Sequence, residues 1–152
     1  MSEFDPKVVN YETAEDDVQV TPDVTGVELN DPSEFIEGTN RISIARLAMD
    51  SHAGFERHTH PHNHVLVITE GSGHLIYDRG DGVDERLEFK AGDVFNVRGT
   101  NEHAVTAGPE GIKMFSIGSP PMHLIDPERM VFVDEKHRWM IPREIEDTDS
   151  QE

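Results

Sequence analysis

The sequence predicts an all-β fold, either a barrel or a sandwich, for three reasons. From residue 41 onward, short apolar segments follow one another along the chain. Turn-forming residues separate nearly every pair of these segments, and no convincing helical period intervenes. About eight short strands of this kind are typical of β-barrels and β-sandwiches. With 152 residues, the chain has the length of one folded domain.

The first element is an acidic N-terminal arm, residues 1–33. It carries many carboxylates and only scattered single valines. A segment with so little apolar surface cannot bury enough of it to form part of a core. We therefore expect an arm that contributes no core element and pairs one strand at most.

The barrel is expected over residues 34–118. Its strands are expected, in chain order, in ISIARLAM, GFERHTH, HVLVITEG, GHLIYD, RLEF, DVFNV, EHAVTA and IKMFSIG. The uninterrupted apolar run at 65–68 predicts a strand that is buried on both faces. The RGDG sequence at 79–82 predicts a hairpin turn, and residues 90–93 predict a second turn before the next strand.

A C-terminal extension, residues 119–152, begins at a proline-rich break in the pattern of strands. We expect one strand in the segment MVFVD and packing of Trp139 on the barrel. The last residues, EIEDTDSQE, are acidic and nearly free of apolar side chains, so we expect this end to be disordered.

Composition and charge exclude several classes of function. The chain has no cysteine, which excludes disulfides, thiolate metal sites and a cysteine nucleophile. Its 31 acidic residues against 13 lysines and arginines give a formal net charge of −18, which repels nucleic acid. The N-terminus lacks the pattern of a signal peptide, and no apolar run approaches the about 20 residues of a membrane span. We expect a cytoplasmic protein without nucleic-acid or membrane partners.

The acid-rich, lysine-poor composition is similar to that of haloarchaeal proteins, which work in molar salt. At about 1 M salt the Debye length is about 3 Å, so the mutual repulsion of surface carboxylates is screened. At low salt the same repulsion destabilises the fold. We predict a halophilic protein; the alternative is an acidic mesophilic protein with charged tails.

Histidines are concentrated in one short segment, which holds His58, His60, His62 and His64. His58 and His60 are two residues apart near the end of a predicted strand, so their side chains leave the same face. His64 opens the next, antiparallel strand, and His103 opens a strand of a second hairpin. We predict that His58, His60, His64 and His103 bind one divalent transition-metal ion. Imidazole ligands suit iron, manganese, copper, nickel and zinc, and the sequence does not distinguish between them.

The spacing around these histidines resembles the first cupin motif. Gly54 precedes the pair His58-x-His60, three residues separate the pair from His64, and six more lead to Gly71. The usual glutamate of this motif is His64 here. Replacing a carboxylate by a neutral imidazole leaves the bound ion its full formal charge. This favours an anionic substrate or a bound hydroxide.

A second cupin-like motif runs from Gly92 to His103. The turn that precedes the histidine is Arg98-Gly99-Thr100, where the family usually has Pro-x-Gly. The resemblance covers about residues 41–118. It implies a small single-domain cupin, a jelly-roll or double-stranded β-helix barrel with a four-histidine metal site.

Three other residues near the predicted metal site are candidates for a role. Glu56 is two residues before His58 and is expected to share its inward face, as a general base or as a rim residue paired with an arginine. Arg98 would bind a substrate carboxylate by a bidentate fork, or else is simply solvated. His62 lies in the turn between two strands, so we expect it to be exposed.

The resemblance favours a metal-dependent oxidoreductase of dioxygenase type that acts on a small organic substrate. Two alternatives remain open: a non-redox isomerase or lyase, and a non-catalytic module that binds a small ligand. One barrel hosts all of these functions, so the sequence leaves the substrate, the reaction and the metal open. Cupins commonly pair through their barrel edges, and we therefore expect a homodimer.

Overall fold

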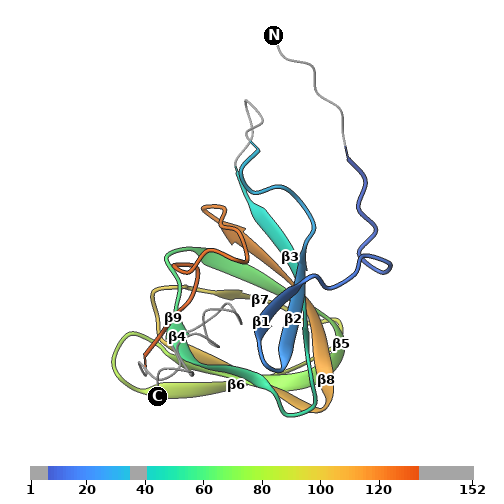
Figure 1. The fold of residues 1–152 in the computed structure, drawn as a ribbon. Helices are drawn as coiled ribbons and strands as arrows, with labels where there is room; N and C mark the ends of the chain where they lie inside the picture. The colour runs from blue at the N-terminus through green and yellow to red at the C-terminus, as the bar shows by residue number, and fades with distance from the viewer. Residues whose placement is uncertain (1–6, 35–40, 134–152) are drawn as a thin grey trace, which may run out of the picture.

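The computed structural model describes residues 7–34 and 41–133, which form an all-β fold (Figure 1). Its strands are β1 (Val18–Thr21), β2 (Val24–Glu28), β3 (Ser43–Met49), β4 (Gly54–Thr59), β5 (Asn63–Asp78), β6 (Asp84–Lys90), β7 (Val94–Val97), β8 (His103–Ser119) and β9 (Val131–Phe132). No helix among the described residues has the length and apolar character of a membrane-spanning segment. The predicted all-β class is confirmed.

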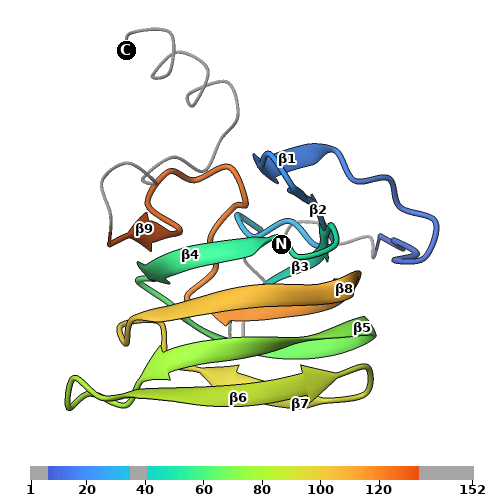
Figure 2. The same cartoon turned by 90° about the horizontal axis from the view of Figure 1, so that it is seen from below.

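Two long strands, β5 and β8, organise the barrel. They pair antiparallel from Asn63↔Ser119 to Tyr77↔His103. The half of β8 near Ser119 also pairs with β3, and the half near His103 pairs with β4. In the same way β5 pairs with β7 in its first half and with β6 in its second half. Figure 2 shows β4, β8, β5 and β6 side by side in this order. Each long strand therefore belongs to two sheets that face each other across one interior.

The long strands bend where two glycines meet. Gly71 and Gly111 have φ angles of 81° and 75°, which residues other than glycine rarely adopt. A Cβ atom at Gly71 would lie 2.0 Å from the carbonyl oxygen of Gly111. The pairing of β5 and β8 shifts register on both sides of Gly71. Such irregularities bend strands, so this position allows one pair of strands to serve both sheets.

The core lies between the two sheets. Its larger apolar side chains are Leu47, Met49, Phe55, Leu66, Ile68, Leu75, Phe89, Ile112, Met114, Leu124, Met130 and Phe132. On β5, Leu66 and Ile68 point into this core, whereas Val65 and Val67 are only half-buried. The expectation of a strand buried on both faces at 65–68 is therefore wrong, because only one face of β5 meets the opposite sheet.

The turns expected in the barrel are confirmed. Residues 79–82 connect β5 to β6, with positive φ angles at Gly80 and Gly82. Residues 90–93 form the turn before β7, closed by a hydrogen bond from the Asp93 amide to the Lys90 carbonyl. In both cases glycine and a polar residue specify the turn locally, so the sequence was sufficient to predict it.

The N-terminal arm contributes more to the core than the sequence indicates. β2 pairs with β3 along its whole length, from Val24↔Met49 to Glu28↔Ala45, and Val24 is 0% exposed. Val20 and Val27 are also buried. The expectation that this segment adds no core element is wrong. Backbone pairing with β3 places the few valines at inward positions, and a count of apolar residues does not include this contribution.

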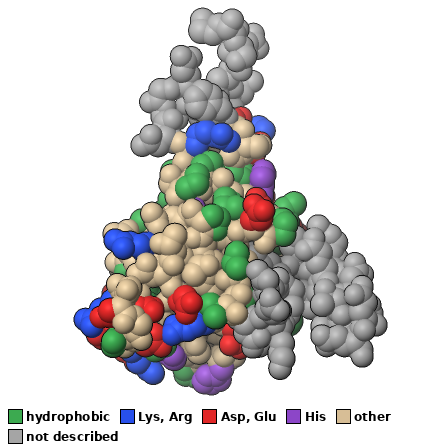
Figure 3. Space-filling model, turned by 90° about the vertical axis from the view of Figure 1, so that its left-hand side faces the viewer, with side chains coloured by type: hydrophobic (Ala, Val, Ile, Leu, Met, Phe, Trp, Pro, Cys, Tyr) green, Lys and Arg blue, Asp and Glu red, His purple; other side chains and the backbone are tan. Residues whose placement is uncertain are grey.

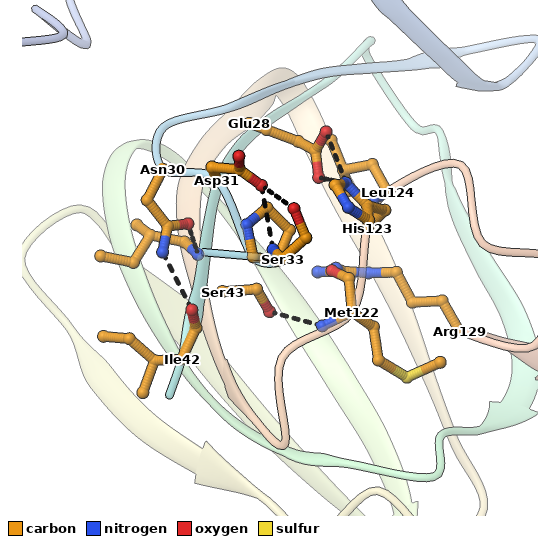
Figure 4. A network of polar contacts seen from close by, with 12 residues as sticks. Glu28, Asn30, Asp31, Ser33, Ile42, Ser43, Met122, His123, Leu124 and Arg129 are labelled. Atoms are coloured by element: carbon orange, nitrogen blue, oxygen red, sulfur yellow. Dashed lines mark hydrogen bonds and ion pairs between the residues drawn. The ribbon is translucent and has the colours of Figure 1, made fainter. Parts of the chain in front are cut away.

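A segment that we call the strap, residues 120–130, crosses one end of the barrel before β9. Polar contacts join it to the barrel (Figure 4). The Met122 amide donates to Ser43 Oγ (3.3 Å), the Leu124 amide donates to Glu28 Oε2 (3.2 Å), and His123 Nδ1 lies 3.0 Å from the same oxygen. Leu124 and Met130 of the strap are buried and pack in the hydrophobic core.

The strap leads to the strand predicted in MVFVD. Val131 and Phe132 form β9, which pairs with the end of β4 next to His58. This part of the extension is confirmed. The predicted packing of Trp139 and the predicted disorder of the acidic end concern residues 134–152, which lie outside the described residues.

The surface carries many charges. On the face shown in Figure 3, acidic and basic side chains lie close together toward one end of the molecule, with apolar side chains scattered among them. Ion pairs join Arg57 to Asp84 (2.6 Å) and Arg86 to Glu88 (2.6 Å). Because these side chains are partly or largely exposed, each pair contributes at most about 1 kcal/mol.

Candidate metal centre

A β-bulge in β4 orients the first histidine. Between the pairs Phe55↔Val105 and His58↔His103, three positions of β4 are matched by only two of β8. Phe55 and His58 therefore both point inward, and His58 is 1% exposed. Without the bulge, simple alternation would turn them to opposite faces.

The same bulge changes the position of Glu56. Its side chain is exposed, so the expectation that it shares the inward face of His58 is wrong. What Glu56 brings to the site is its backbone carbonyl, which accepts a hydrogen bond from His58 Nδ1. The expectation assumed that side chains alternate between the two faces, as they do in a regular strand. Nothing in the local sequence reveals the extra residue of the bulge.

The other predicted ligands lie around His58. His103 is its cross-strand partner, with ring centroids 4.3 Å apart. His60 follows the end of β4, where its amide donates to the Gly99 carbonyl (2.7 Å), and its ring lies 4.7 Å from that of His58. His64 is in β5, and its ring lies 4.6 Å from that of His60. The structure thus brings all four predicted side chains together.

A hydrogen bond at Nδ1 fixes the orientation of each of the four rings. The Nδ1 atoms of His58, His60 and His103 face the carbonyl oxygens of Glu56, Arg129 (2.8 Å) and Asn101 (2.7 Å). Because a carbonyl only accepts, each of these Nδ1 atoms carries the proton, and each Nε2 atom presents a lone pair. His64 Nδ1 lies 3.0 Å from the hydroxyl of Ser116. Metal-binding histidines are commonly oriented in this way.

No hydrogen-bond donor among the described residues reaches the Nε2 atoms of these four histidines. His58 Nε2 and His60 Nε2 are 3.1 Å apart. With both protons on Nδ1, two lone pairs face each other there. The Nε2 atoms of His64 and His103 are buried and have no hydrogen-bond partner among the described residues. Buried polar atoms without partners are rare, and here they are imidazole nitrogens of the kind that metal ions bind.

The donor set fits a metal ion. His58, His60 and His103 each offer a ligand atom within 4.8 Å of the others. Nitrogens bound at about 2.0–2.1 Å to one ion lie about 2.8–3.4 Å from each other at neighbouring octahedral or tetrahedral positions, which agrees with the His58–His60 separation. His64 is not in this compact group, but it lines the same cavity, and its buried Nε2 atom has no partner among the described residues.

Burial keeps these imidazoles neutral. Together with the neighbouring histidines, it lowers the pKa of His58 to about 3 and that of His60 well below the usual value. Burial has the same effect on His64, and it lowers the pKa of His103. Neutral imidazole is the form that binds metals, so the folded protein presents the ligands ready for binding.

The histidines border a small cavity, of about 30 Å³, which we call the metal cavity. Its lining is Leu47, Phe55, His58, His60, His64, Leu66, His103, Val105, Met114, Ser116, Arg129 and Met130. A cavity must offer roughly 10–15 Å³ to admit one water molecule. The metal cavity therefore has room for an ion and one small ligand, and apolar side chains form most of its wall.

A larger pocket of about 380 Å³, which we call the mouth pocket, lies on another side of His103. Its lining is Leu75, Tyr77, Asp78, Arg79, Leu87, Asn96, Val97, Arg98, Asn101 and His103. Arg98 is exposed here. Within the described part of the chain its guanidinium forms no ion pair, whereas Arg79 is paired with Asp81 and Glu85. The structure thus places Arg98 at a pocket that shares His103 with the metal cavity.

His62 is buried, and the expectation that it is exposed is wrong. The side chain is 1% exposed, and neither ring nitrogen has a partner within residues 7–34 and 41–133. The ring packs against Gly118, where an added Cβ atom would lie 2.6 Å from His62 Cδ2. Burial lowers the pKa of His62 to about 4, with a further contribution from the charge of Arg129. A turn position alone therefore did not predict exposure.

Two residues of the site have no sequence signal. Ser116 meets His64 because β5 and β8 are neighbours, and Arg129 meets His60 because the strap crosses the barrel end. Their partners are distant in the sequence, with separations of 52 and 69 residues. Only the tertiary fold brings them to the histidines.

Comparison with known proteins gives one family and a common fold. A family model for the cupin domain matches residues 45–118. No curated protein shows significant sequence similarity to the chain. Solved structures do match, and all of those described next are under 25% identical, so their likeness concerns the fold.

The oxalate decarboxylase of Lactobacillus farciminis, solved as a formate complex, has a TM-score of 0.71 at 13% identity. The alignment covers 99% of this chain and 43% of the decarboxylase, so the chain spans less than half of that protein's length. KdgF from Halomonas sp. has a TM-score of 0.55 at 19% identity, with 74% of this chain and 93% of KdgF covered. A salicylate 1,2-dioxygenase mutant from Pseudoaminobacter salicylatoxidans has a TM-score of 0.54 at 14% identity, with coverages of 66% and 26%.

Proposed function

Residues 45–118 belong to the cupin family, and we propose that this cupin binds one divalent transition-metal ion through His58, His60, His64 and His103. We further propose that it is an oxidoreductase of dioxygenase type that acts on a small organic substrate. The observation that supports this function is the set of four rings whose Nδ1 atoms are hydrogen-bonded and whose Nε2 atoms border one buried cavity.

The protein's own residues prepare the site in two ways. Carbonyl groups of β4, the strap and the turn before β8 hold the rings with their Nε2 atoms inward. Apolar side chains such as Leu66 and Met114 exclude bulk water and so strengthen electrostatic interactions inside. A redox-active ion bound there would supply open coordination positions for oxygen and substrate, and its neutral ligands would leave it a strong Lewis acid.

Arg98 is proposed to bind the substrate at the mouth pocket. A guanidinium free of ion pairs among the described residues can form a bidentate bond to a carboxylate. The pocket has a volume of about 380 Å³, which suits the body of a small organic acid. The folds of oxalate decarboxylase and salicylate dioxygenase, whose names indicate carboxylic acids, are similar to this one, and they make such a substrate reasonable.

Two other functions are consistent with a metal site. An isomerase or lyase needs a group that moves a proton, and the exposed position of Glu56 weighs against that residue as the base. A non-catalytic module that binds a small ligand is favoured by the size of the metal cavity, about 30 Å³, which excludes large ligands. Turnover distinguishes it from the oxidoreductase.

The experiment begins with metal content. Untagged protein, purified without a metal column, is analysed by elemental mass spectrometry before and after reconstitution with iron, manganese, copper, nickel or zinc. We expect about one equivalent of metal per chain. Failure of the chain to take up any of these metals would refute the site.

Oxygen uptake is then measured with an electrode on the loaded protein. The substrates are a panel of small aliphatic and aromatic carboxylic acids, with the corresponding amides as neutral controls. Oxygen consumption with an acid and not with its amide supports the oxidoreductase. Bound metal without oxygen consumption for any substrate refutes it and favours the binding module.

A further inference from the structure

Arg129 brings a positive charge to the metal cavity from outside the barrel. It lies on the strap, its side chain is 4% exposed, and it lines the cavity together with Met130. Its backbone carbonyl accepts the hydrogen bond from His60 Nδ1 (2.8 Å). One residue thus orients a predicted metal ligand through its carbonyl and also lines the metal cavity.

The guanidinium of Arg129 has no ion-pair partner among the described residues. Nη1 donates to the Met122 carbonyl (2.6 Å), which is uncharged. The nearest acidic groups that act on it are Glu28 and Asp126, and neither is within ion-pair distance. In Figure 4 the carboxylate of Glu28 instead accepts a hydrogen bond from the Leu124 amide and lies beside Nδ1 of His123.

Arg129 is nevertheless charged at neutral pH. Burial lowers its pKa to about 10, against the effect of Glu28 and Asp126. Arg129 and His64 line the same cavity, and the rings of His62 and His64 lie close together, with centroids 5.4 Å apart. Both nitrogens of His62 and Nε2 of His64 are the buried atoms without partners there.

The residues that line the cavity carry no negative charge to balance a bound cation. The imidazoles are neutral, and the residues that line the cavity include no carboxylate. A bound divalent ion and the guanidinium would together place three positive charges in an apolar enclosure without an anionic protein group. Burial of unpaired charge is strongly unfavourable, so a ligand that supplies negative charge is required.

We propose that the metal cavity binds a small monoanion, a carboxylate of one or two carbons, between the metal position and the guanidinium of Arg129. This inference rests on the proposed metal site and adds the charge and size of its ligand. The cavity volume of about 30 Å³ limits the buried part of the ligand to a head group of this size. Arg129 is then a binding residue that the strap contributes to the barrel.

The test uses formate as the probe and zinc as a metal that does not support redox turnover. Formate is titrated by isothermal calorimetry into the full-length protein, both metal-free and zinc-loaded, at constant molar potassium chloride. The variants are Arg129→Gln, which keeps a donor for the Met122 carbonyl, and Arg129→Lys, which keeps the charge. Arg86→Gln removes the same charge from the exposed face of β6 and is the matched control. Zinc content is measured for every protein.

We expect formate to bind the zinc-loaded wild type and the Arg86→Gln variant with equal affinity. Affinity should fall at least about tenfold in Arg129→Gln, because a charge-assisted hydrogen bond is lost, and less in Arg129→Lys. Equal formate affinity in wild type and Arg129→Gln, at equal zinc content, would overturn the proposal.

Formamide, which has nearly the shape of formate but no charge, gives a measurement that does not depend on a variant. We expect wild type to bind formate and not formamide, and equal binding of both would overturn the proposal. If wild type takes up no zinc, the proposed function fails, and the metal-free titration decides this inference separately. Formate binding that depends on Arg129 would then support the anion site, and its absence would overturn it.

Discussion

The replacement His103→Ala tests the metal site most directly, through the stability that a bound ion adds. With free metal at 100 times the dissociation constant, binding adds about 2.7 kcal/mol to the free energy of unfolding. For a chain of 152 residues this corresponds to a rise of about 5–10 °C in melting temperature. Removal of a group that hydrogen-bonds to a metal ligand lowers metal affinity about 10–100-fold, so removal of the ligand itself should lower it at least about 100-fold.

At the same free metal concentration, the variant is at or below half saturation. Its stabilisation by metal is then at most about 0.4 kcal/mol, which is about 1–2 °C. The matched control is His62→Ala, since His62 and His103 are both 1% exposed but only His103 is a predicted ligand. The control should keep about one equivalent of metal and most of the thermal shift.

Scanning calorimetry of chelator-treated and metal-loaded samples measures these shifts, and elemental analysis measures the metal. A His103→Ala protein with the full wild-type shift would refute the assignment of this ligand. If His62→Ala loses metal and His64→Ala does not, His62 is a ligand in place of His64, and the site proposed above is wrong.

The remaining predictions concern the support of the site, the fold and the surface. Ser116→Ala should weaken metal binding about 10–100-fold, because the ring of His64 loses the hydroxyl that orients it. Ser119→Ala is the control and should keep the metal affinity of the wild type. Equal metal affinity in the two variants would show that the Ser116 hydroxyl has no such role. Gly71→Ala should lower the free energy of unfolding by at least about 2 kcal/mol, whereas Gly82→Ala should lower it by about 1 kcal/mol. Both glycines have a φ of 81°, but only at Gly71 would an added Cβ atom meet a backbone carbonyl. Similar denaturation midpoints for the two variants would contradict this. Unfolding free energy should rise between low and molar potassium chloride if the protein is halophilic, and equal stability in both would refute that prediction. Light scattering in molar salt should give the mass of a dimer, and a monomer would refute the expected pairing of barrel edges.

The contrast between the surface and the site has a functional consequence. The chain has a net charge of −18, yet the metal cavity is lined by neutral histidines and one guanidinium. The long-range field of such a surface repels anions, and this repulsion is weak in molar salt. An anionic ligand would therefore reach the cavity more easily under the salt conditions that the composition predicts for the protein.

The exposed carboxylate of Glu56 also bears on the choice of reaction. A general base in this barrel would have to be another group, and no carboxylate lines the metal cavity among the described residues. The proposed site instead uses neutral ligands and Arg129, groups that would bind and polarise rather than accept protons. This is one reason for ranking the oxidoreductase above the isomerase or lyase.

The sequence alone determined the fold class, the turns of the barrel and the predicted ligands. The strands and turns follow from local chemistry: period-two apolar patterns, glycines with positive φ and polar turn residues. The spacing of His58, His60, His64 and His103 matched a family motif, and the structure brings these four rings together. Each of these features depends on residues close together in the chain or on a motif that can be read directly.

Tertiary structure alone decided the orientation of Glu56, the burial of His62 and the approach of Arg129. A bulge in β4 reversed the expected side of Glu56, and the ring of His62 is buried because Gly118 of a distant strand leaves space for it. The strap brings the Arg129 carbonyl to His60 across 69 residues. Such contacts depend on how strands and loops pack against each other, whereas a period-two pattern describes only one regular strand.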